Sequence, residues 1–422
     1  MILLHHPTGN TFSRALLKSL LEADQLGLFA TTIAIDERAW WLRFLPAKIR
    51  AELLRRKYDA PRDKLFTRPA REYARMIAGR LGLSFLDRHE TGIVSFDAIY
   101  RDLDQALAER LPELAAERDL CGVYAYEGGA LQTFRAAKRL ALKCYYDLPI
   151  AYWETSQRLL HEEAERWPEW EPTLLGVQDS IAKNKAKTEE ISLADVVVCP
   201  SQFVLDSIPE ALRRGGSCVV AEFGSPIPPR PPEFRAPGRK LRVLFAGSMS
   251  QRKGLADVFA AMKLLKGADI ELIVLGSPIA PMDFYLRQFS EFVYERPRPH
   301  QQVLELMETC DALILPSIVE GRALVQQEAM SRGLVLLATA NAGGQDLIED
   351  GRAGFLLPIR SPETIAARLE WLDDNRDAIP NMKRAAYEKA SALTWKGYTD
   401  KILSAITGAR SPAPLREPVH AG

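Results

Sequence analysis

Short apolar runs alternate with amphipathic stretches through the second half of this chain. They lie at residues 241–248, 270–277, 311–317, 333–340 and 354–358. Each run is five to eight residues long, whereas a buried helix needs about ten or more. Such runs predict parallel strands that are covered by helices on both faces. We therefore expect a doubly wound α/β, Rossmann-like domain over residues 241–385.

The first half repeats this pattern less regularly. Strand-like runs occur at residues 1–6, 28–35, 121–127, 148–154, 194–201 and 217–223. They indicate a second Rossmann-like domain over residues 1–223, interrupted at about 37–92 by a basic, aromatic-rich, helical insertion. Six prolines fall within residues 224–240, and because proline donates no backbone hydrogen bond, we expect a stiff linker there. Two such domains would enclose a cleft between the carboxyl ends of their strands, where ligands of these sheets bind.

The composition excludes several classes of protein. Lys and Arg (55) balance Asp and Glu (55), so the overall charge favours no nucleic-acid partner. The five cysteines are odd in number, far apart and form no C-x-x-C pair, which argues against a disulfide framework and a zinc site. The start lacks a signal-peptide pattern, and no stretch reaches the roughly eighteen apolar residues of a membrane span. We expect a soluble, cytoplasmic protein with a disordered tail at residues 409–422.

The stretch "SIVEGRALVQQEAM", residues 317–330, follows a strand-like run and leads into a helix that we expect to begin near Arg322 or Ala323. A helix N-terminus at the end of a strand offers free N–H groups and a positive dipole, which suit a phosphate. Glu320 would lie beside this possible phosphate-binding position. Glu328, about two turns further along the helix, could accept hydrogen bonds from the two hydroxyls of a ribose.

A second polar loop precedes a helix in the same domain. In "FAGSMSQRKGL", residues 245–255, Gly247 near the end of the first strand-like run is a candidate ligand-binding residue, and Arg252 and Lys253 stand at the turn into the helix. Two cations at this place could neutralise a diphosphate leaving group without a metal ion.

Together these residues resemble a known family. The block at 311–358 and the "RKG" turn at 252–254 are similar to the nucleotide-sugar-dependent glycosyltransferases of GT-B fold, in the large retaining family of sucrose synthase and bacterial mannosyltransferases. Residues 194–208 resemble the last strand and helix of that family's first domain, and residues 393–403 resemble its closing helix. The resemblance implies two Rossmann-like domains that face each other, with helices at 386–408 returning to the first domain.

The resemblance also implies roles for individual residues. Arg252 and Lys253 would bind the donor diphosphate, Glu328 the ribose, and Glu320 the transferred sugar near its reacting face. The backbone at Gly321, Arg322 and Ala323 would support the sugar or the phosphate. Transfer would retain the anomeric configuration, with the departing phosphate helping to deprotonate the acceptor, so that neither a protein nucleophile nor a metal is required. UDP is the expected carrier, and the expected acceptors are a glycan, a glycolipid or another acceptor of cell-envelope polysaccharide or glycoconjugate synthesis.

The first domain departs from the family at two places. The family has a glycine-rich first loop, whereas "HHPTGNTFSR" offers only Gly9 with Asn10 for phosphate contact. Where the family often has a histidine, at the end of the run that reads "PIAYWETS", the nearest residue is Glu154. Glu154 and His6, the histidine that we expect to face the cleft, are candidate contacts for the acceptor or sugar. A catalytically lapsed protein that binds a nucleotide sugar as a scaffold remains the alternative hypothesis.

The pair Asp102 and Asp104 forms a D-x-D, which in another glycosyltransferase fold would hold a metal. The stretch around it, however, has helical periodicity, and side chains two residues apart on a helix diverge. We therefore expect both aspartates on a solvated helix surface.

Two interpretations of the insertion remain open. Aromatic and apolar side chains (Trp40, Trp41, Phe44 and Leu45) stand among basic ones (Arg38, Arg43, Lys48, Arg50, Arg55, Arg56 and Lys57). Such a mixture, at residues 38–57, could contact an anionic membrane or a lipid-linked acceptor, which would make the protein peripheral at the inner face of the membrane. Alternatively, the segment is an amphipathic helix that packs on its own domain with its cations outside.

Overall fold

A computed structural model describes residues 1–174, 179–265 and 268–408. The first domain is built on a seven-stranded parallel sheet with the order β3-β2-β1-β4-β5-β6-β7. Its strands are β1 (Ile2–His5), β2 (Leu26–Thr31), β3 (Leu65–Thr67), β4 (Gly122–Tyr126), β5 (Lys143–Asp147), β6 (Val196–Cys199) and β7 (Ser217–Val220). The helices are α1 (Thr11–Glu22), α2 (Ala47–Leu54), α3 (Ala70–Arg80), α4 (Phe96–Glu117), α5 (Leu131–Arg139), α6 (Trp153–Arg166), α7 (Ile181–Leu193), α8 (Gln202–Ser207) and α9 (Glu210–Arg213).

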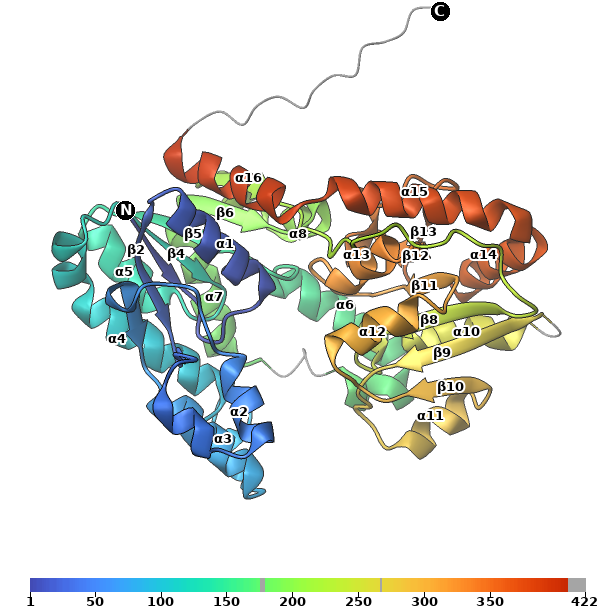
Figure 1. The fold of residues 1–422 in the computed structure, drawn as a ribbon, viewed down its shortest axis with the longest axis horizontal. Helices are drawn as coiled ribbons and strands as arrows, with labels where there is room; N and C mark the ends of the chain where they lie inside the picture. The colour runs from blue at the N-terminus through green and yellow to red at the C-terminus, as the bar shows by residue number, and fades with distance from the viewer. Residues whose placement is uncertain (175–178, 266–267, 409–422) are drawn as a thin grey trace, which may run out of the picture.

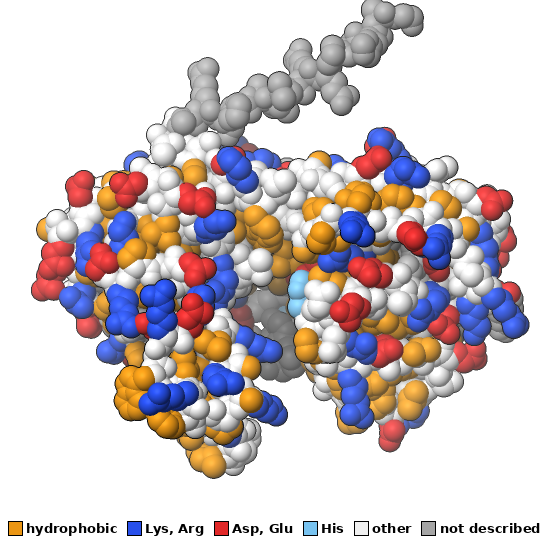
Figure 2. All heavy atoms as spheres, in the orientation of Figure 1, with side chains coloured by type: hydrophobic (Ala, Val, Ile, Leu, Met, Phe, Trp, Pro, Cys, Tyr) orange, Lys and Arg blue, Asp and Glu red, His pale blue; other side chains and the backbone are white. Residues whose placement is uncertain are grey.

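The second domain has a six-stranded parallel sheet with the order β10-β9-β8-β11-β12-β13. Its strands are β8 (Leu241–Ala246), β9 (Ile270–Leu275), β10 (Phe292–Glu295), β11 (Ala312–Leu315), β12 (Val335–Thr339) and β13 (Gly354–Leu357). The helices are α10 (Leu255–Leu264), α11 (Met282–Gln288), α12 (His300–Met307), α13 (Leu324–Ser331), α14 (Pro362–Asp374) and α15 (Ile379–Ala392). Two doubly wound domains are therefore present, as predicted, and they stand side by side with a notch between them (Figures 1 and 2).

The apolar strands bury both of their faces, which is why they read as continuous runs. In β1, Leu3 belongs to one core cluster, whereas Ile2 and Leu4 belong to the cluster on the opposite face of the sheet. This alternation follows from the two-residue period of a strand.

The last helix, α16 (Trp395–Thr407), returns to the first domain and lies along α1 (Figure 1). Its residues Tyr398 and Ile402 are buried there, and the hydroxyl of Tyr145 in β5 donates to the carbonyl of Ile406.

A second crossing between the domains was not predicted. The 3₁₀ helix η4 (Pro168–Thr173) follows α6 in the first half of the chain, yet its Trp170 is buried in the core of the second domain. The Trp170 ring packs edge-on against Phe259, Phe284 and Tyr285, with centroid distances of 5.0 to 5.9 Å. The chain then returns to the first domain in α7, so η4 ties the two domains together.

One strand prediction is wrong, and three strands, β3, β5 and β10, were not predicted. The run at 148–154 is not a strand: the strand is β5, which ends at Asp147, and α6 begins at Trp153. The strand does not continue through Pro149, because proline has no N–H to donate to the neighbouring strand. β5 was not recognised in the sequence because the residues at its two ends are polar. The short edge strands β3 and β10 were missed because partly exposed strands lack a continuous apolar run.

The expectation of a solvated D-x-D is wrong for Asp104, which is 4% exposed. Its carboxylate accepts from the backbone N–H groups of Gln132 (2.8 Å) and Thr133 (2.9 Å) at the start of α5. Burial raises the pKa of Asp104 to about 6, while these hydrogen bonds act in the opposite direction. Asp102 does lie toward solvent, paired with Arg68 and Arg71.

Candidate functional site

The candidate site lies where the second sheet reverses its strand order. The chain leaves β8 toward β9 and β10 on one side and later enters β11, β12 and β13 on the other, so the loops after β8 and β11 diverge at one point of the carboxyl edge. In doubly wound sheets this point is the usual ligand site. The two loops touch: the N–H of Ile318 donates to the carbonyl of Arg252 at 2.9 Å.

Gly254 permits this approach. It has φ +79°, a conformation that side chains other than glycine rarely adopt, and a Cβ there would overlap the carbonyl of Pro316. Gly247, the other glycine of the loop, lies against Lys253: a Cβ on Gly247 would be 3.6 Å from Lys253 Cε. Because Gly254 has no side chain, the loop after β8 packs closely against the loop that carries Glu320.

Arg252, Lys253 and Glu320 converge at this point. Nη1 of Arg252 donates to Glu320 Oε2 at 3.1 Å and to the carbonyl of Val319 at 3.0 Å. The ammonium of Lys253 forms an ion pair with the same carboxylate oxygen. The side chains of Lys253 and Glu320 are only 11% and 15% exposed, so the charges interact with little screening by water.

Burial and the neighbouring charges shift the pKa values of Glu320 and Lys253. Burial favours the neutral form of Glu320, but the charges of Lys253 and Arg252 outweigh it and lower the pKa of Glu320 to about 2. Burial also lowers the pKa of Lys253, and the charge of Glu320 opposes this shift. With all three groups ionised the trio carries one net positive charge, which suits an anionic ligand such as a phosphate.

A buried glutamine fixes the loop that carries the two cations. The side-chain amide of Gln251 donates to Glu163 (2.6 Å) and Asp257 (2.8 Å), and its backbone N–H donates to the hydroxyl of Thr173 at 3.1 Å. Glu163 and Thr173 come from the α6–η4 segment, so this segment supports the cationic loop directly. No sequence motif pointed to these residues, because each is separated from the loop by more than seventy positions.

Glu328 lies in α13, downstream of the same loop, with its side chain 17% exposed. Its Oε1 is 2.9 Å from Nε2 of His300 at the start of α12. Within the described residues, no hydrogen bond or ion pair joins Glu328 to Arg252, Lys253 or Glu320. His300 was not predicted, and only its proximity in space to Glu328 reveals it.

The residues after Glu320 form contacts across the domain boundary. The carbonyl of Gly321 accepts from the hydroxyl of Ser201 at 2.7 Å. The Arg322 guanidinium is buried and donates to the carbonyl of Pro200 (3.3 Å) and to Asp346 (3.1 Å). Its side chain is thus held at the interface, whereas Ala323 is the N-cap residue of α13. Any ligand contact from Arg322 would have to come from its backbone.

The first loop of the first domain is held by His6. Nδ1 of His6 accepts from the N–H groups of Gly9 (2.8 Å) and Thr8 (3.2 Å). Asn10 caps α1 by accepting from the N–H of Ser13 at 2.8 Å. Burial lowers the pKa of His6 to about 3, and Arg14 adds to this shift. His6 is therefore a neutral ring that fixes the loop, with 5% of its surface exposed.

Glu154 lies on the first turn of α6 and is exposed, with no side-chain hydrogen bond in the part of the chain that the structure describes. The carboxylate at the end of the neighbouring strand is Asp147. It is buried and accepts from the hydroxyl of Tyr124 at 2.6 Å, and burial raises its pKa to about 7.

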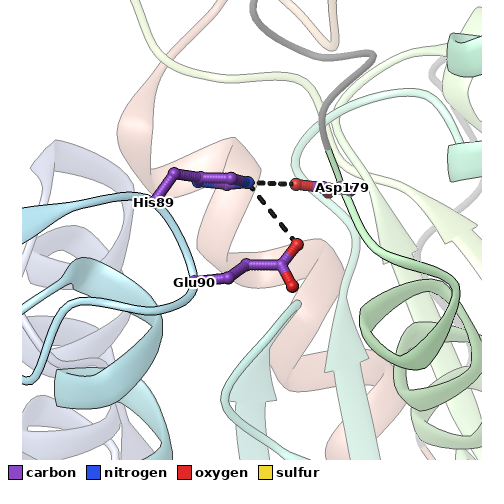
Figure 3. Close-up of side chains that lie close together, drawn as sticks. All are labelled: His89, Glu90 and Asp179. Atoms are coloured by element: carbon purple, nitrogen blue, oxygen red, sulfur yellow. Dashed lines mark hydrogen bonds and ion pairs between the residues drawn. The ribbon is translucent and has the colours of Figure 1, made fainter.

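One group of side chains in the described residues has the spacing of metal ligands: His89, Glu90 and Asp179 (Figure 3). Nε2 of His89 is 3.0 Å from Asp179 Oδ1 and 3.5 Å from Glu90 Oε1. The Asp179 oxygens are already paired with Lys183 and Lys187, both at 2.9 Å. Two ammonium groups next to the carboxylate oppose a cation, so the group is better explained as an ionic contact between the loop before α4 and the start of α7.

Residues 229–389 match the family described as glycosyl transferases group 1. The chain is 30% identical over 173 residues to a putative colanic acid biosynthesis glycosyltransferase, WcaL, of Salmonella typhimurium, covering 37% of this chain and 42% of that protein. It is 29% identical over 184 residues to a D-inositol 3-phosphate glycosyltransferase of Paenarthrobacter aurescens, covering 39% of this chain and 45% of that protein. The chain thus spans less than half the length of these curated relatives.

The likeness in fold extends over nearly the whole chain. A sucrose-phosphate synthase from Thermosynechococcus elongatus superposes with a TM-score of 0.65 at 13% identity, covering 96% of this chain and 98% of that one. Anabaena HepE in complex with UDP superposes with a TM-score of 0.60 at 14% identity, covering 96% and 99%. The chain therefore has the GT-B fold, and its residues 229–389 are similar to the glycosyl transferases group 1 family.

Proposed function

We propose that this protein is a retaining glycosyltransferase that moves a sugar from a nucleoside diphosphate sugar, with UDP as the carrier, to an acceptor held by the first domain. The observation that carries the proposal is the convergence of Arg252, Lys253 and Glu320 at the point where the second sheet reverses its strand order. The match of residues 229–389 to the glycosyl transferases group 1 family supports it.

In this proposal the two cations act on the leaving group. As the bond between the sugar and the diphosphate breaks, negative charge develops on the phosphate, and Arg252 and Lys253 stabilise it. Glu320 accepts hydrogen bonds from the transferred sugar, and Glu328 accepts from the ribose. The phosphate helps to remove the proton of the acceptor hydroxyl, so no protein nucleophile takes part, and the two cations supply the charge that a metal would otherwise bring.

The acceptor that we propose is a glycan, glycolipid or other molecule of cell-envelope polysaccharide or glycoconjugate synthesis, handled in the cytoplasm. The name of the WcaL relative, which refers to colanic acid, supports this choice. The Anabaena structure with UDP supports the choice of nucleotide.

We also propose peripheral contact with an anionic membrane through residues 38–57. Trp40 and Phe44 are 70% and 67% exposed, although their neighbours Leu42 and Leu53 are buried in a small core. The insertion therefore packs on its own domain and still exposes two aromatic rings in a basic segment. Figure 2 shows hydrophobic side chains next to Lys and Arg side chains on the lobe that contains α2 and α3. Within the described residues, no helix is long and apolar enough to cross a bilayer.

Incubation with radiolabelled nucleotide sugars tests the main proposal. A transferase should slowly release free sugar from one donor even without its acceptor, and Lys253→Ala should abolish that release. The alternative, suggested by Glu154, is a catalytically inactive protein that acts as a scaffold. Such a protein should bind a nucleotide sugar but release no free sugar from it.

A further inference from the structure

Glu320 brings a negative charge to the two cations of the candidate donor site. Its Oε2 accepts from Nη1 of Arg252 at 3.1 Å and forms an ion pair with the ammonium of Lys253. Both cations therefore use the same carboxylate oxygen. The other oxygen, Oε1, accepts from the N–H of Gly321 at 3.3 Å, which is longer than the usual range for such a bond. Oε1 can therefore accept from a further donor.

The charge of Glu320 is largely shielded from water. The side chains of Arg252, Lys253 and Glu320 are 28%, 11% and 15% exposed. Burial raises the pKa of Glu320, but the charges of Lys253 and Arg252 outweigh this and hold the pKa at about 2. The carboxylate is therefore ionised at neutral pH. An anion that binds the two cations also meets the charge of Glu320, and like charges repel strongly where water screens them little.

A nucleotide sugar and a free nucleoside diphosphate meet this charge differently. In the proposed donor complex, hydroxyls of the sugar donate to Glu320, so the carboxylate gains hydrogen bonds. A free nucleoside diphosphate offers Glu320 no hydroxyl in place of the sugar. Its terminal phosphate also carries additional negative charge, because it is no longer esterified to the sugar. The diphosphate and Glu320 then compete for Arg252 and Lys253.

We infer that Glu320 is a specificity-determining residue that weakens binding of the free nucleoside diphosphate relative to the nucleotide sugar. The inference rests on the proposed function and adds a means of product release to it. Once the sugar has been transferred, its hydroxyls no longer occupy the carboxylate, and repulsion between Glu320 and the diphosphate favours release. The charge that holds the sugar thus also limits inhibition by the product.

Removal of this charge tests the inference. Glu320→Gln keeps the shape of the side chain and an oxygen that can accept from a sugar hydroxyl. Glu305→Gln, at an exposed position on α12, removes the same charge elsewhere in the second domain and is the matched control. Calorimetry measures binding of three ligands: UDP, uridine, and the UDP-sugar from which the unmodified protein releases free sugar.

We expect Glu320→Gln to bind UDP about fivefold or more tightly than the unmodified protein does, because the diphosphate no longer competes with a carboxylate. Uridine, which has no phosphate, should bind within about twofold of its original affinity. The UDP-sugar should bind equally well or more weakly, because an amide accepts less strongly than a carboxylate. Glu305→Gln should bind all three ligands as the unmodified protein does.

Uridine also reports whether the variant is folded, since its binding needs an intact second domain but no phosphate contact. If Glu320→Gln loses uridine binding, Glu320→Ala takes its place in the comparison. UDP binding that is unchanged or weaker in the folded variant, or an equal gain for UDP and the UDP-sugar, would overturn the inference. Failure of the unmodified protein to bind UDP would count against the proposed function, and the inference would fall with it.

Discussion

Gly321 in the second domain lies so close to Pro149 in the first that a Cβ on Gly321 would overlap the Pro149 carbonyl oxygen. This contact is one residue from Glu320, and the Gly321 carbonyl also accepts from Ser201 of the first domain. The loop that carries the central carboxylate is therefore fixed against the opposite domain.

Gly321→Ala should lower the free energy of unfolding by about 1–3 kcal/mol, because the added methyl group must push the two domains apart. Gly79→Ala is the control: it lies within α3, where a Cβ would meet nothing within 4 Å. Alanine there should be neutral or stabilising by up to about 1 kcal/mol. Urea unfolding measures both, and equal free energies for the two variants would show that the Gly321 contact is absent in solution.

Trp170→Ala should destabilise the protein by about 3–5 kcal/mol, because it leaves a cavity in the second core. Trp371, on α14, is 36% exposed, and Trp371→Ala should cost clearly less. The same unfolding experiment compares them. If Trp170→Ala lowers the free energy of unfolding only slightly, η4 does not pack into the core of the second domain as described.

Asp147 should make the free energy of unfolding depend on pH, and the direction of that dependence follows from its pKa. Its folded-state pKa is about 7 and its ordinary value is 3.8, so the folded protein holds a proton that the unfolded chain releases. Its contribution to stability is full below about pH 4 and is lost as the pH rises through about 7. Asp147→Asn keeps an acceptor for Tyr124 and removes this loss.

Relative to the unmodified protein, Asp147→Asn should therefore gain on the order of 2 kcal/mol in unfolding free energy between about pH 5 and about pH 8. Asp102→Asn, at a partly exposed and ion-paired position, should show no such gain. Denaturant titrations at the two pH values provide the measurement. A difference that stays constant with pH would contradict the assignment.

Membrane contact depends on the exposed rings at Trp40 and Phe44. The double variant Trp40→Ala/Phe44→Ala should bind vesicles of phosphatidylcholine and phosphatidylglycerol about tenfold or more weakly, because it loses apolar area that would enter the interface. Leu286→Ala, at a 45% exposed position on α11, should bind normally. Co-sedimentation measures both, and equal binding of the double variant, or binding that is insensitive to salt, would argue against this contact.

Most of the second domain could be predicted from its sequence because its buried strands read as apolar runs that helices separate. The loop of Arg252 and Lys253 and the loop of Glu320 were predicted for the same reason, since each follows such a strand. Strand β5 was misplaced because Lys143 and Asp147 at its ends look polar, although Asp147 is buried.

The supports of the site could not be predicted, because they depend on contacts between distant segments. Gln251 reads as an ordinary loop residue until Glu163 and Thr173 are seen beside it. Likewise, His300 draws no attention until α12 brings it to Glu328. Periodicity locates elements and the loops between them, but it does not show which distant side chains will meet.

The most direct test of the central claim is calorimetric binding of UDP and of uridine to Lys253→Ala and to the unmodified protein. If Lys253 binds the diphosphate, the variant should bind UDP about thirtyfold or more weakly, because a buried charge-assisted contact to phosphate is lost. Binding of uridine, which has no phosphate, should change by less than about twofold. Equal losses for both ligands, or no loss for either, would contradict the account.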